Sequence, residues 1–324
     1  ALPIYEFGKA DAKAAVYTGT VKAGTAAVML TTSALPATYH IAEGGPLAFT
    51  RAGNAVTVTI APPREEAVPA DSLIGRAKFD LWHFKDAQIQ PTQLLQVNQA
   101  LNRTFQGIVS LATKKFTRMT DENFPNAQYS DDAKVALQAT GVPYDLERTW
   151  GDGGTDVYLT DPATGTRKLL AKKISGQAQL SVGGKYVAWY DAKHWFAYSI
   201  STGKTVDLNA SLKGHHFDNE TDDHPTEPPA WGAAGWTKDD KALLVYDRWD
   251  VWEFDPSGVK PPVVLTDSVG RRGSIQLRLI ALDRDADERA IDPAKPAWLS
   301  AFADETSKRE LLARFDAWVA ARGL

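Results

Sequence analysis

Residues 235–266 read GWTKDDKALLVYDRWDVWEFDPSGVKPPVVLT, and this stretch decides the fold. Short apolar runs without helical spacing occupy 242–246 and 263–265, and residues 250–254 between them alternate polar and apolar side chains. Such runs are typical of β-strands. The Asp-Pro-Ser-Gly sequence at 255–258 favours a tight turn. The stretch therefore predicts three antiparallel strands joined by turns, which is a β-meander.

The same order of turns and strands recurs earlier in the chain. Lys134, Lys185 and Lys241 each precede the first long strand of one copy. Their spacing gives a repeat of roughly 50 residues, a period typical of propeller blades. A weaker fourth copy covers residues 49–60. The clearest copies are 122–172, 175–210 and 230–268.

The repeat predicts an all-β fold, namely a β-propeller over residues 1–302 with about five or six blades. The alternative is a β-sandwich or barrel whose hairpins merely look alike. We favour the propeller because the same turn chemistry returns at the same place in each copy. The ring is either complete or incomplete and degenerate. An open ring would expose two sheet edges, so in that case we expect an oligomer or a capping helix.

Two segments depart from the repeat. Residues 46–118 are typical of one blade interrupted by an insertion, in which 62–72 form a proline-rich loop and 93–102 have weak helical spacing. At the carboxyl end, residues 303–324 predict a short amphipathic α-helix. Its apolar face would consist of Leu311, Leu312, Phe315, Trp318 and Val319.

Composition excludes several classes of function. The formal net charge is −4 and no long basic run occurs, so neither nucleic acid nor an anionic membrane surface is an expected partner. The chain has no cysteine, which removes disulfides, thiolate metal ligands and cysteine nucleophiles. No apolar segment is long enough to span a bilayer. We therefore expect a soluble protein.

One loop concentrates groups that bind metals in other proteins. Residues 214–224 read GHHFDNETDDH and contain three of the six histidines together with four carboxylates. Histidine with carboxylate binds zinc, and clustered carboxylates bind calcium, but no ligand spacing of either kind is matched. A structural loop, an interaction surface and a metal site remain open, and we assign no metal and no cofactor. The weak candidates are His215, His216, Asp218, Asp222, Asp223 and His224.

Two charged groups have competing interpretations. Arg271 and Arg272 could bind a carboxylate ligand, because guanidinium groups suit carboxylates, but we favour a salt bridge between blades. Asp247 and Asp250 could line a channel mouth. We favour the hypothesis that they close a hairpin, with Trp249 and Trp252 packed between blades.

Three segments carry a family resemblance. They are DLWHFKDAQIQPTQ at 80–93, the unit at 235–258, and LTDSVGRRGSIQLRLI at 265–280. Together they resemble the propeller part of large bacterial prolyl-oligopeptidase-like serine peptidases, over residues 46–302. In that family the propeller covers an α/β-hydrolase domain that bears a serine, an aspartate and a histidine. The resemblance also implies a periplasmic or secreted protein.

The resemblance does not place a catalytic site in this chain. A nucleophile elbow requires Gly-x-Ser-x-Gly, and no serine here has both glycines; the nearest, Ser257 and Ser274, suit turns or strand starts. Dipeptidyl peptidases of the family bind the substrate amino terminus with adjacent glutamates. Glu65 and Glu66 stand in a different context and Glu253 stands alone, so we predict no catalytic or substrate-binding residue.

Three functions remain as hypotheses. The first is a non-catalytic propeller that gates or selects peptides for a hydrolase domain, with that domain or a peptide or protein as its partner. The second is a free-standing, TolB-like scaffold that binds a protein or a ligand. The third is a propeller glycosidase with paired carboxylates. The fold does not choose among them.

Overall fold

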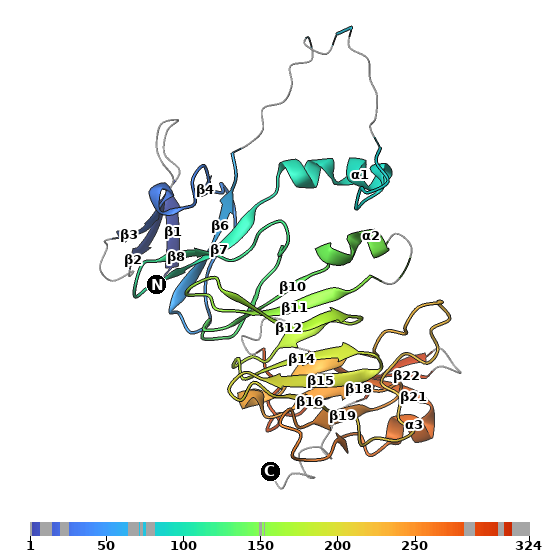
Figure 1. Ribbon diagram of the computed structural model, residues 1–324. Helices are drawn as coiled ribbons and strands as arrows, with labels where there is room; N and C mark the ends of the chain where they lie inside the picture. Colours follow the sequence, from blue (N-terminus) through green and yellow to red (C-terminus); the bar gives the residue numbers. More distant parts are fainter. Residues whose placement is uncertain are drawn as a thin grey trace. The chain divides into compact units, whose positions relative to one another are not determined.

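The structure of the chain is a computed structural model (Figure 1). It describes residues 2–6, 15–19, 26–63, 71, 74–75, 82–148, 151, 153–281, 289–303 and 308–312. The chain divides into two compact units. Unit 1 comprises Ala1–Ala127, Asp131–Gly154 and Tyr158–Leu169. Unit 2 comprises Gln128–Ser130, Thr155–Val157 and Leu170–Leu324.

The described residues form six antiparallel sheets. The first has the order β1 (Leu2–Glu6), β2 (Ala15–Gly19) and β3 (Ala26–Thr31). The second has the order β4 (His40–Ile41), β6 (Ala55–Ala61), β7 (Phe105–Ser110) and β8 (Phe116–Arg118), and β5 (Leu47–Phe49) also pairs with β6. The third contains β9 (Gln128–Tyr129), β10 (Ala136–Thr140), β11 (Thr155–Thr160) and β12 (Arg167–Ile174) in sequence order.

The remaining three sheets belong to unit 2. The fourth is β13 (Ala178–Leu180), β14 (Tyr186–Asp191), β15 (His194–Ser199) and β16 (Thr205–Asp207). The fifth is β17 (Ala233–Trp236), β18 (Leu243–Tyr246), β19 (Val251–Phe254) and β20 (Val263–Val264). The sixth is β21 (Ile275–Ile280), β22 (Trp298–Ala303) and β23 (Lys308–Leu312). The short helices are α1 (Gln90–Leu101), α2 (Asp145–Arg148) and α3 (Val269–Gly273), with 3-10 turns η1 (Thr32–Ala34), η3 (Val142–Tyr144) and η4 (Lys238–Asp240).

The predicted all-β class and propeller fold are confirmed. The third, fourth and fifth sheets are each four-stranded, with strands hydrogen-bonded in sequence order. This is the meander that the turns predicted, repeated three times in succession. In the described part of the chain, no helix is long and apolar enough to cross a membrane.

The turns close because their residue types fit the backbone that a hairpin needs. Between β18 and β19, Asp247 Oδ1 accepts hydrogen bonds from the backbone N–H groups of Trp249 at 2.8 Å and Asp250 at 2.6 Å. This confirms that Asp247 closes the hairpin. After β19, Gly258 has φ of +72°, and a Cβ there would lie 2.4 Å from Val206 Cγ1. Glycine is therefore required at this turn.

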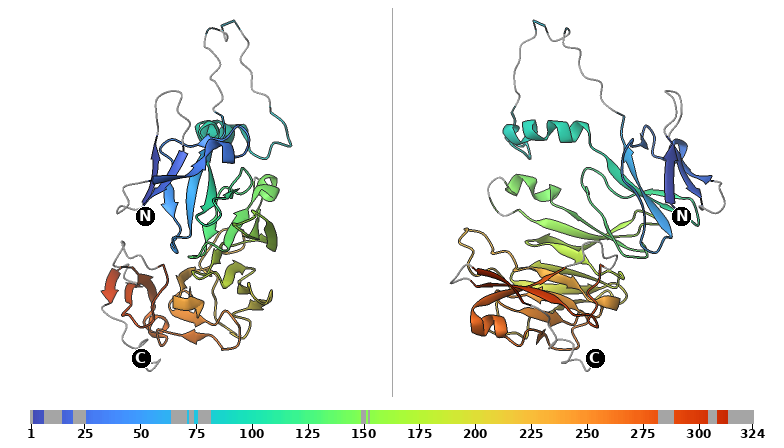
Figure 2. Two further views of the ribbon diagram at one scale, coloured as in Figure 1. Left: turned by 90° about the vertical axis from the view of Figure 1, so that its left-hand side faces the viewer. Right: turned by 180° about the vertical axis from the view of Figure 1, so that it is seen from behind.

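Aromatic side chains pack the sheets of unit 2 face to face, and these sheets run from yellow to red in Figure 2. One buried cluster joins the fourth and fifth sheets and includes Trp195, Trp236, Trp252 and Phe254. The predicted packing of Trp252 between blades is thereby confirmed. A second cluster joins Leu244, Tyr246 and Val251 of the fifth sheet to Leu299 of the sixth. Burial of each such side chain contributes about 1.5–3 kcal/mol.

A buried aspartate links the fourth sheet to the fifth. Asp240, in η4, is only 2 % exposed. Its carboxylate accepts hydrogen bonds from Ser181 Oγ at 2.7 Å and from the backbone N–H groups of Gly183 at 2.8 Å and Lys185 at 3.1 Å. A Cβ on Gly183 would lie 2.9 Å from the carboxylate. The absence of a side chain at Gly183 therefore allows the turn between β13 and β14 to approach the Asp240 carboxylate this closely.

The predicted C-terminal helix is wrong where the structure describes this segment. Lys308–Leu312 form strand β23, which pairs with β22 in the register Leu299↔Leu312 to Ala303↔Lys308. Residues 304–307 and 313–324 lie outside the described residues. Strand pairing satisfies the backbone groups of β22 that would otherwise be left at a sheet edge. The free energy gained from these backbone hydrogen bonds outweighs the helical preference that the spacing of the apolar side chains indicates.

The insertion in the second sheet lies between β6 and β7. The helix predicted at 93–102 is confirmed as α1 (Gln90–Leu101), seen as a separate helix in Figure 1. Trp82 to Phe84, before this helix, form no strand. The backbone N–H of His83 donates to Asp86 Oδ2 at 3.0 Å instead. This local side-chain bond stabilises a turn in place of a strand.

We predict that Asp240→Asn destabilises the fold while Asp239→Asn does not. Both aspartates have positive φ, 58° and 63°, which asparagine tolerates. An amide at position 240 leaves a buried donor without an acceptor, so the free energy of unfolding should fall by about 1–3 kcal/mol. Asp239 is exposed and forms a 3.7 Å ion pair with Lys241, which is worth little. Urea unfolding measures both variants, and equal losses would contradict the linking role of Asp240.

Candidate functional site

The histidine-rich loop joins β16 to β17 across residues 208–232. Its anchor is Phe217, which is 1 % exposed and packs edge-on against Trp252 and Phe254, with ring centroids 5.7 and 5.2 Å away. An antiparallel bridge between Asp218 and Ala230 fixes the base of the loop. Loops of this length in a compact domain are often functional, so both the loop and its surroundings are candidates.

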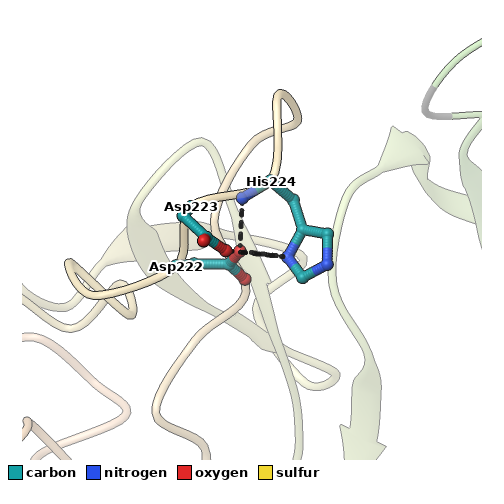
Figure 3. Close-up of side chains that lie close together, drawn as sticks. All are labelled: Asp222, Asp223 and His224. Carbon is teal, nitrogen blue, oxygen red and sulfur yellow. Dashed lines mark hydrogen bonds and ion pairs between the residues drawn. The ribbon is translucent and has the colours of Figure 1, made fainter.

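The loop brings three of its six candidate ligands together. Asp222, Asp223 and His224 each offer an atom within 4.8 Å of the others (Figure 3). The backbone N–H of His224 donates to Asp222 Oδ1 at 3.0 Å, and His224 Nδ1 contacts the same oxygen. The side chain of Asp223 is 100 % exposed and that of His224 is 75 % exposed. Water therefore solvates these groups, and the cluster alone does not constitute a metal site.

The other three candidate ligands lie elsewhere. His216 Nδ1 is 3.3 Å from Asp218 Oδ1, and Lys193 Nζ is 3.4 Å from Asp218 Oδ2. The ring of His215 packs edge-on against Trp252 at 4.8 Å. The set of six therefore separates into a surface cluster, an ion-paired group around Asp218 and a packing histidine.

Hydrogen bonding sets the ionisation of Asp222. The backbone N–H of His224, followed by the ring of the same residue, holds the pKa of the Asp222 carboxyl below its ordinary value. Both donors favour the charged carboxylate. Asp222 consequently remains an anion down to lower pH than an unpaired aspartate.

A cavity of about 580 Å³ lies beside the base of this loop in unit 2. Its volume is in the range of small-ligand sites. Its walls come from segments just before and within β13 and β17, and from β11, β14 and β15. The lining residues are Thr155, Ser175, Gly176, Gln177, Ala178, Gln179, Tyr190, Trp195, Pro229, Ala230, Gly232 and Ala233.

Tyr190 and Trp195 form the aromatic part of the cavity wall. Tyr190 and Trp195 are paired in the β14–β15 register, with ring centroids 5.8 Å apart. The Tyr190 hydroxyl donates to the backbone oxygen of Pro228 at a long 3.4 Å. Trp195 is only 4 % exposed, and its buried Nε1–H has no acceptor among the described residues. A buried donor without an acceptor is costly.

The surroundings of Tyr190 are negatively charged. Burial, followed by the charges of Asp218, Glu227 and Asp191, raises the pKa of Tyr190 well above its ordinary value. The phenol therefore stays protonated and acts as a neutral donor. The lining combines an aromatic wall with polar side chains and main-chain groups, and among the described residues that form it Tyr190 is the ionisable one.

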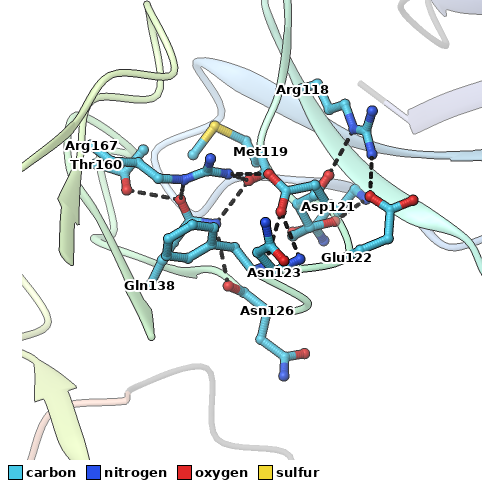
Figure 4. Close-up of polar contacts among 12 residues, drawn as sticks. Arg118, Met119, Asp121, Glu122, Asn123, Asn126, Gln138, Thr160 and Arg167 are labelled. Atoms are coloured by element: carbon cyan, nitrogen blue, oxygen red, sulfur yellow. Dashed lines mark hydrogen bonds and ion pairs between the residues drawn. The ribbon is translucent and has the colours of Figure 1, made fainter. Parts of the chain in front are cut away.

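A separate polar cluster in unit 1 is structural (Figure 4). Gln138 is 1 % exposed, and its Oε1 accepts hydrogen bonds from Thr160 Oγ1 at 2.8 Å and from Arg167 Nε at 2.9 Å. Its Nε2 donates to the backbone oxygen of Met119 at 2.8 Å. Arg167 also pairs with Asp121 at 2.9 Å. The side chains of Gln138, Thr160, Arg167 and Asp121 thus satisfy one another, and the cluster holds strands together.

The arginine pair forms ion pairs within the protein. Arg271 Nη2 is 2.7 Å from Asp247 Oδ2, whose side chain is fully buried. Arg272 is 3.4 Å from the exposed Asp267. Asp250, also buried, accepts hydrogen bonds from the backbone N–H groups of Gly270 at 3.0 Å and Arg271 at 3.1 Å. The predicted salt bridge is confirmed for Arg271, which lies in the link between the fifth and sixth sheets.

The serines and glutamates considered from sequence fall outside the cavity. Ser257 Oγ donates to Asp255 Oδ1 at 2.7 Å in a turn, and Ser274 ends α3 with φ of 51°. Glu253 lies on β19. Glu65 and Glu66 lie outside the described residues.

Sequence reasoning missed the cavity residues themselves. Tyr190 and Trp195 lie in apolar runs typical of strands, which carry no signal for a cavity. Ala178 and Ala233 lie in segments too short to show a strand period.

Comparison with known proteins gives no family by sequence. No protein-family model matches the chain, and no curated protein matches it.

Solved structures do resemble it. They include TolB from Acinetobacter baumannii at 12 % identity and a TM-score of 0.33, which covers 93 % of this chain and 60 % of that one. Dipeptidyl peptidase 4 from Porphyromonas gingivalis matches at 11 % identity and a TM-score of 0.43, covering 98 % of this chain and 46 % of that one. The β-propeller domain of the trilobed protease from Pyrococcus furiosus matches at 9 % identity and 0.38, covering 95 % and 73 %. The chain thus spans about half of the peptidase. These similar structures include a TolB protein, a peptidase and the propeller domain of a protease, and similarities this distant say nothing about activity.

We predict that His224→Ala raises the pKa of Asp222 only part of the way toward its ordinary value. The substitution removes the ring contact but keeps the backbone N–H, which has the larger effect. Because the pKa of Asp222 is lowered in the folded protein, its ionised form stabilises the fold at pH values above the ordinary aspartate pKa. This stabilisation is lost as the pH falls through the lowered pKa. Carboxyl-carbon NMR titration measures the shift, and an unchanged pKa would show that the ring does not interact with the carboxylate in solution.

We also predict that Arg271→Ala lowers the free energy of unfolding by about 2 kcal/mol, because it leaves the buried Asp247 carboxylate without its countercharge. The adjacent Arg272→Ala is the control, and its exposed ion pair should contribute less than about 0.5 kcal/mol. Chemical unfolding compares the two variants. An equal loss of unfolding free energy in the two variants would mean that the buried ion pair stabilises the fold no more than the exposed one.

Proposed function

We propose that this chain is a non-catalytic propeller that binds peptides, and that the cavity beside the histidine-rich loop is its binding site. The observation that carries the proposal is the cavity of about 580 Å³, whose wall joins the aromatic side chains of Tyr190 and Trp195 to polar side chains and the main chain of two strand edges. An aromatic wall with a few fixed polar groups is the usual composition of a ligand site.

Binding accounts for the residue types at this site better than catalysis does. Hydrolysis of a peptide requires a nucleophile with a base in reach, or an activated water. The lining provides hydroxyl, amide and main-chain groups, and its titratable member, Tyr190, is held in the neutral form. The sequence contains no Gly-x-Ser-x-Gly elbow. These groups orient a ligand by hydrogen bonds and do not attack it.

The same site serves two biological settings. As part of a prolyl-oligopeptidase-like peptidase, the propeller would select peptides for a hydrolase domain. As a TolB-like scaffold in the periplasm, it would bind an extended segment of another protein. Both settings are part of the proposal, and they differ only in what receives the peptide.

The proposal predicts that the chain retains members of a random hexapeptide library with acetylated and amidated ends. Ser175→Trp should abolish retention, because Ser175 lines the cavity and its replacement would obstruct it. Ser201→Trp, on an exposed turn outside the cavity, should retain the same peptides. Mass spectrometry of the retained fraction is the measurement. No retention by the unaltered chain would overturn the proposed function, and retention by Ser175→Trp would remove the cavity as the site.

A further inference from the structure

We infer that the cavity recognises the main chain of an extended peptide through the open edges of β13 and β17. This inference rests on the proposed function and specifies how the ligand binds. Two strands expose main-chain groups to the same cavity, at Ala178 and at Ala233. The orientation of both groups follows from the strand registers.

The open edge of β13 is fixed by its pairing with β14. The backbone N–H of Ser181 donates to Tyr186 O at 2.9 Å, so these two residues form a hydrogen-bonded pair. In an antiparallel ladder, hydrogen-bonded pairs alternate with non-hydrogen-bonded pairs. In the latter, the backbone N–H and C=O groups of both residues point away from the partner strand. Leu180 and Ala178, which are paired in register with Val187 and Trp189, therefore direct their peptide groups to the open side.

The neighbouring bonds support this orientation. The N–H of Leu180 donates to the side-chain oxygen of Gln128 at 3.0 Å, on the side away from β14. Ala178, two residues earlier on the same edge, pairs with no strand other than β14 in the described structure. Its peptide groups therefore face the cavity that Ala178 lines.

The edge of β17 has the same property. The backbone N–H of Tyr246 donates to Gly232 O at 3.0 Å, and the next pair in register is Ala233 with Val245. By the same alternation, the peptide groups of Ala233 point away from β18. Further along this edge, Trp236 O accepts a hydrogen bond from the N–H of Ile291 at 2.8 Å. At Trp236 the edge is thus already paired with another segment, whereas at Ala233 it is open within the described residues.

These two edges determine the kind of ligand. Unpaired N–H and C=O groups on a strand edge are satisfied best by another extended backbone, which is the basis of β-strand addition. Recognition of this kind depends on the ligand's amide groups and tolerates many side chains.

The experiment compares two hexapeptide libraries on the immobilised full chain. One is the acetylated and amidated random library, and the other has the same composition with every internal amide N-methylated. N-methylation removes the donors, so we expect retention to fall about tenfold or more. Equal retention would overturn main-chain recognition while leaving peptide binding intact. Retention of neither library would overturn the proposed function and this inference with it.

A second test changes the protein. Ala178→Pro and Ala233→Pro each remove one edge N–H, and proline is tolerated at an edge whose N–H is not used in the ladder. Each should weaken binding of a retained peptide about three- to tenfold, the effect of one hydrogen bond. Ala178→Val and Ala233→Val keep the N–H and are the matched controls, and circular dichroism checks that all four variants are folded. If both proline variants bind as tightly as the valine variants, the edges do not bind the ligand and the inference is wrong.

Discussion

Buried aspartate carboxylates at the turns are the interaction on which this structure depends. Asp240, Asp247 and Asp250 are each at most 2 % exposed, and each accepts hydrogen bonds from backbone N–H groups of a turn or of a neighbouring segment. Such groups would otherwise be buried without partners. A carboxylate is an efficient partner because one group accepts several donors and the charge strengthens each bond. In a chain without cysteine, these contacts link successive sheets of unit 2 as covalent cross-links do in other proteins.

The same architecture creates the open strand edges on which the proposed binding site rests. Each meander satisfies the backbone of its inner strands, but its first strand keeps one edge without a partner from the same sheet. Aromatic side chains pack between the faces of successive sheets. Because they extend perpendicular to the plane of each sheet, they do not cover the free edge of its first strand. At β13 and β17 the edge borders the cavity, and we propose that the unpaired peptide groups there bind a peptide.

The fold could be predicted further than the site. The turn at 255–258 and the apolar runs around it are local signals, and they predicted β18, β19 and β20 nearly residue by residue. The first strands β9, β13 and β17 are two, three and four residues long, too short to produce a period. At β23 the apolar spacing favoured a helix, but pairing with β22 determines the conformation. Thr155, Tyr190 and Ala233 meet at one cavity although they are far apart in sequence, and no sequence pattern indicates such a meeting.

The contrast between the histidine-rich loop and the cavity shows why residue type alone is a poor guide to function. His224 and Asp222 contact each other, but both belong to a surface cluster in which water competes for every donor and acceptor. Electrostatic interactions in such surroundings are screened and weak. Ala178 and Ala233 have no polar side chain, yet both line the cavity at strand edges that pair with no further strand in the described part of the chain. The free energy available for binding depends on which groups lack partners in the unbound protein, and we therefore place the proposed peptide site at these edges and not at the histidine-rich loop.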